Sequence, residues 1–129
     1  MIGYTQGRFD VVHHGHVTSL MAMRGYLGKD AKFIVGVATD EFCREWKGVE
    51  PKLNWHERAT VIRHLDMVDM VIPYVGYADL VYDRIGFDVF FCTEELFEKD
   101  FTYYANKPFK TVYFPRTPGI SSTMLKGKQ

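Results

Sequence analysis

The sequence predicts an α/β fold: a single Rossmann-like α/β/α domain over residues 1–129, with an open five-stranded parallel sheet. Five short apolar runs alternate with segments of helical periodicity, the pattern of a parallel sheet with helices on both faces. The two most distinctive polar motifs each follow one of these runs, and such sheets bind ligands beyond the carboxyl ends of their strands. A chain of 129 residues that is 47% apolar suits one domain with a sizeable core.

A glycine-bearing turn separates the first expected strand from the first helix. Residues 1–6 form a short apolar run. Apolar side chains then recur at helical spacing over 15–27, and Gly28 is the expected stop. Residues 32–38 follow as a near-continuous apolar run, which is typical of a strand buried on both faces.

Cap residues mark the next two helices. Thr39 caps a short helix over 40–46, and the glycine and proline of 47–54 predict a loop. Asn54 then caps a helix that extends to about Leu65. The remaining chain alternates in the same way, with strands expected at 67–73, 88–92 and 110–114, helices at 77–85 and 121–126, and a short helix with irregular chain over 94–104.

Composition limits the classes of partner. Lys+Arg and Asp+Glu both number 16, so a net charge of zero gives no support for binding long nucleic acid or an anionic membrane surface. No apolar run approaches the roughly 20 residues that span a bilayer, so no membrane insertion is expected. Cys43 and Cys92 are expected to be buried free thiols, and no leader peptide is evident. We therefore expect a soluble cytoplasmic protein.

The motif after the first run carries two histidines at the start of a helix. His13 and His16 are three positions apart and share a helix face, while Gly15 lets the backbone approach a ligand. Free N–H groups at a helix N-terminus attract anions, so both imidazoles are expected to face one phosphate. A His-x-x-His metal site and a pair of structural histidines remain as alternatives. His14 should point elsewhere and is given no role.

The second motif follows the last expected strand. Arg116 is shaped for bidentate phosphate binding. Three hydroxyls at 121–123 open a helix and leave N–H groups free for a phosphate, although they would also serve as a plain helix cap. Together, the two motifs suggest a nucleoside triphosphate held from two sides.

Six segments in order resemble the nucleotidyltransferase superfamily with the His-x-Gly-His signature, and most closely the small cytidylyltransferases of the glycerol-3-phosphate cytidylyltransferase type. They are G-R-F-D-x-x-H-H-G-H (7–16), A-T-D-E-F (38–42), W-H-E-R (55–58), V-D-M-V-I-P (68–73), F-D-V-F (87–90) and R-T-P-G-I-S-S-T (116–123). The first motif identifies only the superfamily, whereas the last is more typical of the cytidylyl branch. The resemblance implies a homodimer that uses CTP, Mg²⁺ bound mainly through the CTP phosphates, and a small phosphorylated acceptor.

The resemblance also implies roles for individual residues. The catalytic residues would be His13, His16 and Arg116. The nucleotide-binding residues would be Gly7, Arg8, Phe9, Gly15, Asp40, Arg58, Arg63, Thr93, Ile120, Ser121, Ser122 and Thr123. The acceptor-binding residues would be Lys47, Arg8 and Tyr77. No protein nucleophile is needed, because the acceptor phosphate attacks the α-phosphorus of CTP and pyrophosphate leaves.

Three positions depart from the family pattern. Asp66 stands where the family usually has a basic residue, and Arg63 one turn earlier is the expected substitute for it. Residues 92–96 differ from the family's loop beside the base and acceptor pockets. Arg8 replaces a small polar residue, and its guanidinium either binds an acidic acceptor group or faces solvent.

Two other functions are weighed against the cytidylyltransferase. An adenylyltransferase of the same superfamily would have a nearly identical triphosphate site. A nucleotide-binding module that has lost catalysis would fit Asp66 and the altered loop, although the intact His13, His16 and Arg116 oppose it. The homodimer is further favoured by aromatic residues that one small sheet is not expected to bury: Tyr77, Tyr82, Phe97, Phe101, Tyr103, Tyr104 and Phe109.

Overall fold

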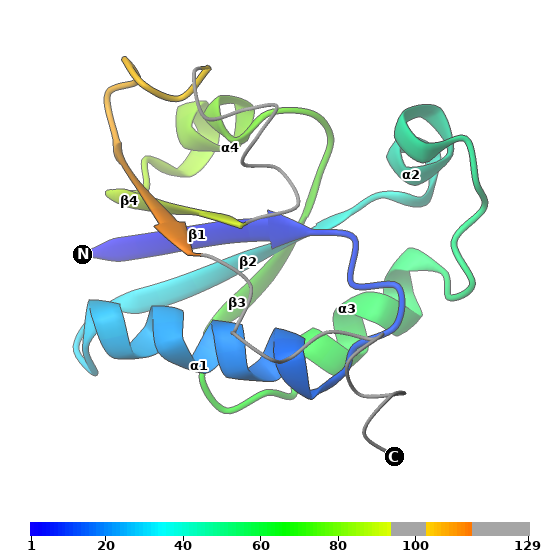
Figure 1. Ribbon diagram of the computed structural model, residues 1–129, viewed down its shortest axis with the longest axis horizontal. Helices are drawn as coiled ribbons and strands as arrows, with labels where there is room; N and C mark the ends of the chain where they lie inside the picture. Colours follow the sequence, from blue (N-terminus) through cyan, green and yellow to red (C-terminus); the bar gives the residue numbers. More distant parts are fainter. Residues whose placement is uncertain (94–102, 115–129) are drawn as a thin grey trace.

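The computed structural model describes residues 1–93 and 103–114, which form an α/β fold (Figure 1). Its elements in chain order are β1 (Ile2–Gly7), α1 (His14–Leu27), β2 (Lys32–Ala38), α2 (Asp40–Lys47), α3 (Trp55–Arg63), β3 (Met70–Tyr74), α4 (Ala78–Ile85), β4 (Val89–Thr93) and β5 (Lys110–Phe114). No helix among these residues is both long and apolar enough to cross a membrane.

The five strands form one parallel sheet in the order β3-β2-β1-β4-β5. The predicted open parallel sheet is therefore confirmed. β1 lies at the centre, with β2 on one side and β4 on the other, so the strand order reverses there. In sheets of this kind, the crevice at that reversal, beyond the carboxyl ends of the strands, is the usual ligand site.

Helices cover both faces of the sheet, with α1 and α3 below it and α2 and α4 above it in Figure 1. Side chains of β2 alternate between these layers. Phe33, Val35 and Val37 pack with residues of α1 and α3, whereas Ile34 and Ala38 pack with residues of α2 and α4. β2 is thus buried on both faces, as its continuous apolar run predicts.

The layer below α4 is mainly aromatic. Phe87 stacks on Tyr4 with ring centroids 4.9 Å apart and meets Phe109 at 4.8 Å. Tyr104 is 2% exposed and Phe109 is 6% exposed, so the sheet buries more of the aromatic stretch than expected. Tyr77 and Tyr103 remain exposed on the surface. Phe97 and Phe101 lie outside the described residues.

Several element boundaries differ from the expectation by one to three residues, and three of these shifts have an identifiable cause. α1 begins one residue early because the His13 side chain caps it. α3 ends at Arg63 instead of Leu65, and β3 begins at Met70 instead of residue 67. A turn intervenes, in which the Val68 N–H donates to the Leu65 carbonyl at 3.1 Å. These three shifts arise from side-chain caps and turns, which short apolar patterns do not encode.

Gly36 in β2 gives the buried Tyr4 hydroxyl its space. Burial, with nearby Tyr74 and Tyr104, raises the pKa of Tyr4, so its hydroxyl stays protonated and donates to Gln6 Oε1 at 2.7 Å. Gln6 Nε2 in turn donates to the Gly76 carbonyl at 3.1 Å. A Cβ at position 36 would overlap that hydroxyl.

We predict that Gly36→Ala lowers the free energy of unfolding by about 1–3 kcal/mol, the usual cost of overpacking a core. Urea denaturation measures this change. Gly25→Ala is the matched control, because Gly25 lies exposed within α1 with nothing within 4 Å of an added Cβ. It should stabilise the helix by up to about 1 kcal/mol. Equal effects of the two substitutions would contradict the packing assigned to Gly36.

Candidate active site

The candidate site lies beyond the carboxyl ends of the central strands. β1 ends at Gly7, β2 at Ala38 and β4 at Thr93, and Thr93 is in register with Phe114 at the end of β5. Residues from these ends and the loops that follow them make up the described part of the site. The predicted phosphate-binding residues of the last segment lie outside the described residues: Arg116, Ile120, Ser121, Ser122 and Thr123.

His13 and His16 meet at the start of α1, as their spacing predicts. Their ring centroids are 4.1 Å apart, and both side chains are half-buried. His13 Nδ1 accepts a hydrogen bond from the Gly15 backbone N–H at 3.0 Å, and His16 Nδ1 accepts one from the His13 backbone N–H at 3.2 Å. The two imidazoles therefore form a reciprocal capping box of the kind usually built from Ser or Thr and Glu.

This capping box determines the chemistry of the two rings. In a neutral imidazole, one nitrogen accepts and the other carries the proton. Because Nδ1 of each ring accepts a backbone N–H, the proton lies on Nε2. Each ring can then donate from Nε2 to an anion, next to the positive end of the α1 dipole. His14 is exposed and contributes no such cap.

The turn between β1 and α1 is held in a strained conformation. Phe9 has φ +51°, a left-handed value that is uncommon for a bulky side chain. Its ring packs over Gly7, where a Cβ would meet the ring at 3.0 Å, and edge-on against His16 at 5.8 Å between centroids. Gly7 and Phe9 thus shape the floor beside the histidines.

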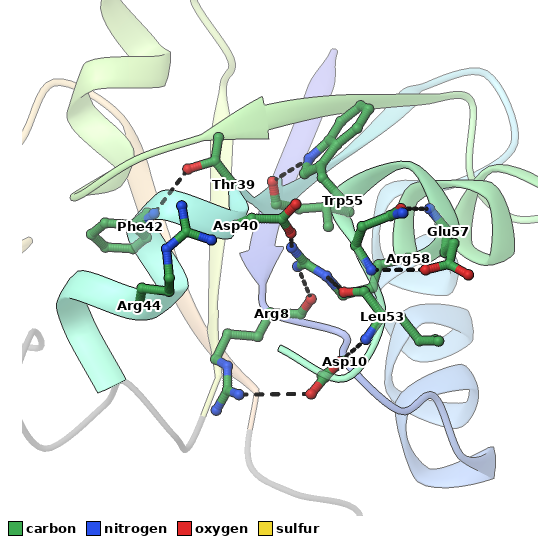
Figure 2. A network of polar contacts seen from close by, with 12 residues as sticks. Arg8, Asp10, Thr39, Asp40, Phe42, Arg44, Leu53, Trp55, Glu57 and Arg58 are labelled. Carbon is green, nitrogen blue, oxygen red and sulfur yellow. Dashed lines mark hydrogen bonds and ion pairs between the residues drawn. The ribbon is translucent and has the colours of Figure 1, made fainter. Parts of the chain in front are cut away.

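A buried arginine joins the segments around the site (Figure 2). Arg58 of α3 is 0% exposed. Its Nε donates to the Leu53 carbonyl at 2.9 Å, and its two terminal nitrogens donate to the Arg8 carbonyl at 2.7 Å and to Asp40 Oδ1 at 2.6 Å. One guanidinium thereby connects the turn after β1, the start of α2 and the loop before α3. Asp40 and Arg58, both predicted near the nucleotide, are directly bonded to each other.

Asp10 fixes the same loop from the other side. Its two carboxylate oxygens accept the backbone N–H groups of Lys52 and Leu53, each at 3.0 Å. Partial burial works to raise the pKa of Asp10, but these two donors and the nearby guanidinium groups of Arg8 and Arg58 together lower it below its ordinary value. Asp10 stands in the first motif, yet its sequence position alone gave it no role.

The remaining predicted residues occupy several places. Thr93 is half-buried at the edge of the sheet, and Lys47 is the last residue of α2. Tyr77 caps α4 and stacks on Tyr103 with ring centroids 4.0 Å apart. Arg63 is exposed at the far end of α3, about 12 Å along the helix axis from Trp55. Trp55 itself is anchored at the carboxyl end of β2 by a bond to the Val37 carbonyl.

We predict that Arg58→Ala lowers the free energy of unfolding by about 3–5 kcal/mol, because it empties the space of a fully buried side chain and leaves three partly buried acceptors without their donor. Denaturant unfolding measures this cost. Arg44→Ala is the control: Arg44 pairs with Glu50 at 3.1 Å on the exposed surface, and such pairs contribute about 0–1 kcal/mol. A cost for Arg58→Ala no larger than that of the control would contradict the role of the network.

The lowered pKa of Asp10 predicts how its contribution depends on pH. A carboxyl whose pKa is lower in the folded state stabilises the protein above its unfolded pKa, near 3.8, and that stabilisation is lost as the pH falls through the folded value. Asp10→Asn should therefore destabilise the protein at pH 7. The difference from the wild type should shrink below about pH 4. A difference in unfolding free energy that stays constant or grows in acid would rule this out.

Comparison with known proteins agrees with this geometry. A family model described as cytidylyltransferase-like matches residues 4–128. The chain is 32% identical over 126 residues to glycerol-3-phosphate cytidylyltransferase of Staphylococcus aureus, covering 95% of this chain and 89% of that protein. It is 38% identical over 66 residues to FAD synthase of Korarchaeum cryptofilum, covering 51% and 45%.

A solved structure supports the fold. The lipopolysaccharide core biosynthesis protein of Thermoplasma volcanium superposes with a TM-score of 0.71 at 22% identity, covering 90% of this chain and 97% of that one. The family model and the match to the Staphylococcus aureus protein span nearly the whole chain, including the histidine motif and the Arg58 network. The chain therefore belongs to the cytidylyltransferase-like family and is a nucleotidyltransferase.

Proposed function

We propose that the protein transfers CMP from CTP to a small phosphorylated acceptor, giving a CDP-linked product and pyrophosphate. The acceptor would be a polyol phosphate like glycerol 3-phosphate, or an amino-alcohol phosphate. The observation that carries this proposal is the reciprocal capping box at the start of α1, in which Nδ1 of both His13 and His16 accepts a backbone N–H. The relatives named glycerol-3-phosphate cytidylyltransferase, including one from Bacillus subtilis that is 32% identical over 124 residues, support the choice of nucleotide and acceptor.

The proposed reaction needs charge stabilisation more than covalent help from the protein. An acceptor phosphate oxygen attacks the α-phosphorus of CTP, the bond to the β-phosphate oxygen breaks, and pyrophosphate leaves. The negative charge that develops on these oxygens is met by the Nε2 protons of His13 and His16. Arg116 and the hydroxyls of Ser121, Ser122 and Thr123 are proposed to bind the β- and γ-phosphates from the other side.

Mg²⁺ is proposed to arrive with CTP and to neutralise phosphate charge. Mg²⁺ in such sites keeps several waters and is held by substrate phosphates with few protein ligands. Among residues 1–93 and 103–114, no group of three His, Cys, Asp or Glu side chains is arranged to hold a metal ion. Because Mg²⁺ in such sites is held largely by substrate phosphates, we propose the phosphates of CTP as its main ligands.

The hydrogen-bond network of Arg58 is proposed to shape the nucleotide cleft, without Arg58 itself donating a hydrogen bond to the nucleotide. All three nitrogen positions of Arg58 already donate to protein acceptors. Arg58 and Asp40 would thus act by holding the backbone of Gly7, Arg8 and Phe9 in place. Lys47 and Tyr77 remain proposed acceptor contacts.

A homodimer is proposed from the exposed apolar surface near α4. Tyr77 and Val75 of the β3–α4 loop are 43% and 52% exposed, Leu80 of α4 is 50% exposed, and Tyr103 is 37% exposed. Exposed aromatic and aliphatic side chains of this kind are common at interfaces. A light-scattering mass near 30 kDa, twice the 15.0 kDa of one chain, would support it.

Adenylyl transfer is the second candidate, favoured by the match to an FAD synthase over half of the chain. FAD is an adenine dinucleotide, so a relative that makes it shows that this framework also serves adenine nucleotides. Pyrophosphate release with each of the four NTPs, across a panel of polyol, sugar and amino-alcohol phosphates, separates the two functions. Turnover with CTP and a polyol phosphate would support our proposal, whereas turnover with ATP alone would replace it with the second.

The capping box allows the catalytic and structural roles of His16 to be separated. In a His16→Asn variant the amide oxygen can take the position of Nδ1 as a hydrogen-bond acceptor. In a His16→Gln variant the amide nitrogen can take the position of Nε2 as a donor. We predict that His16→Asn keeps the stability of α1 but lowers kcat by about 10²–10³-fold. His16→Gln should retain more activity than His16→Asn, and it should also keep most of the stability of α1, because Gln at this helix position can accept the His13 N–H as in other capping boxes.

The control is His14→Ala, since His14 is exposed and makes neither cap bond. It should change kcat and the thermal midpoint little. Equal losses of kcat in His14→Ala and His16→Asn would show that the two faces are wrongly assigned.

A further inference from the structure

Arg8 has a fixed backbone and a side chain with little to bind. Its carbonyl accepts from the buried Arg58 at 2.7 Å, and the strained Phe9 follows it. The Arg8 side chain is 29% exposed. Its Nε is buried and has no hydrogen-bond partner among residues 1–93 and 103–114. A donor held in place but left without an acceptor is costly to bury unless a ligand completes it.

The nearest described counter-ion does not satisfy this guanidinium. Arg8 and Asp10 approach only to 3.9 Å between a terminal nitrogen and Oδ2. Asp10 already accepts two backbone N–H groups at 3.0 Å. Within residues 1–93 and 103–114, the planar donor fork of Arg8 therefore has capacity for another oxyanion.

The direction of the side chain indicates which oxyanion it could meet. Phe9 packs its ring against His16, on the α1 side of the turn. Arg8 extends to the other side of the turn, beside Asp10 and towards α2 (Figure 2). In phosphoryl transfer the attacking and leaving oxygens lie roughly in line, on opposite sides of the phosphorus. If the histidines hold the triphosphate, Arg8 lies on the side from which the acceptor approaches.

We propose that Arg8 is a specificity-determining residue whose guanidinium binds an oxyanion of the acceptor. This inference rests on the proposed function, because it needs an anionic acceptor opposite the triphosphate. The oxyanion is either the attacking phosphate or a second acid group of the same molecule.

Calorimetric titration tests the proposal without requiring turnover. The full-length wild type, saturated with the unreactive α,β-methylene analogue of CTP, is titrated with glycerol 3-phosphate and, separately, with 3-phosphoglycerate, which adds a carboxylate. Arg8→Gln should weaken binding of the anionic acceptor by about 10–100-fold. Arg8→Lys keeps the positive charge but loses the planar donor fork, so its affinity for the acceptor should lie between those of the wild type and Arg8→Gln. Affinity for the CTP analogue should change less than about 2-fold.

Arg44→Gln is the matched control, because Arg44 is an exposed arginine of α2 that pairs with Glu50. It should leave all affinities unchanged. A loss for both acceptors identifies the attacking phosphate as the bound group, and a loss for 3-phosphoglycerate alone identifies the second acid. Unchanged acceptor binding in Arg8→Gln, a loss confined to the CTP analogue, or no wild-type binding of either acceptor would overturn the proposal. Pyrophosphate release by the wild type with CTP and an acceptor tests the proposed CMP transfer independently of the role of Arg8.

Discussion

The buried guanidinium of Arg58 is the interaction on which the rest of the site depends. It joins three segments that the sheet alone would leave independent: the turn after β1, the start of α2 and the loop before α3. A charge with 0% exposure is tolerated only because every nitrogen donates to a carbonyl or to Asp40. One guanidinium makes all three hydrogen bonds, so the three segments can keep them only in one relative arrangement. Arg58 therefore fixes the backbone geometry of the cleft.

Structure and chemistry share the same atoms at the start of α1. A helix must satisfy its first N–H groups, and here two imidazoles satisfy them through Nδ1. The same bonds favour the tautomer that carries its proton on Nε2, and they fix both rings at the start of the helix. The strained Phe9 closes this arrangement by packing against both Gly7 and His16. Strain is stored where the surrounding contacts are strong enough to hold it.

The sheet determines where these features meet. All five strands are parallel, so both motif-bearing ends, those of β1 and β5, lie on one edge of one sheet. The two cores differ in character: aliphatic side chains with Phe33 and Phe91 lie below the sheet, and a ring cluster around Phe87 and Phe90 lies above it. The cluster extends towards Tyr104, whose hydroxyl accepts the Ala78 N–H at the start of α4. Some residues of this aromatic stretch, such as Tyr104, are therefore part of the core, whereas Tyr77 and Tyr103 form an exposed stacked pair.

Local pattern by itself determined the parallel α/β class, most helix starts and the histidine pair. Each depends on residues a few positions apart: Asn54 and Thr39 as caps, the run at 32–38, and the three-residue spacing of His13 and His16. Only the tertiary structure decided the Arg58 network, the role of Asp10 and the direction of Arg8. Arg58 reaches a carbonyl 50 positions away and Asp10 a backbone N–H 43 positions away, so these partners are set by chain packing and leave no periodic trace. The shortened α3 and the late start of β3 have the same cause, because the turn between them is fixed by contacts such as the Asp69 bond to Phe33 in the neighbouring strand.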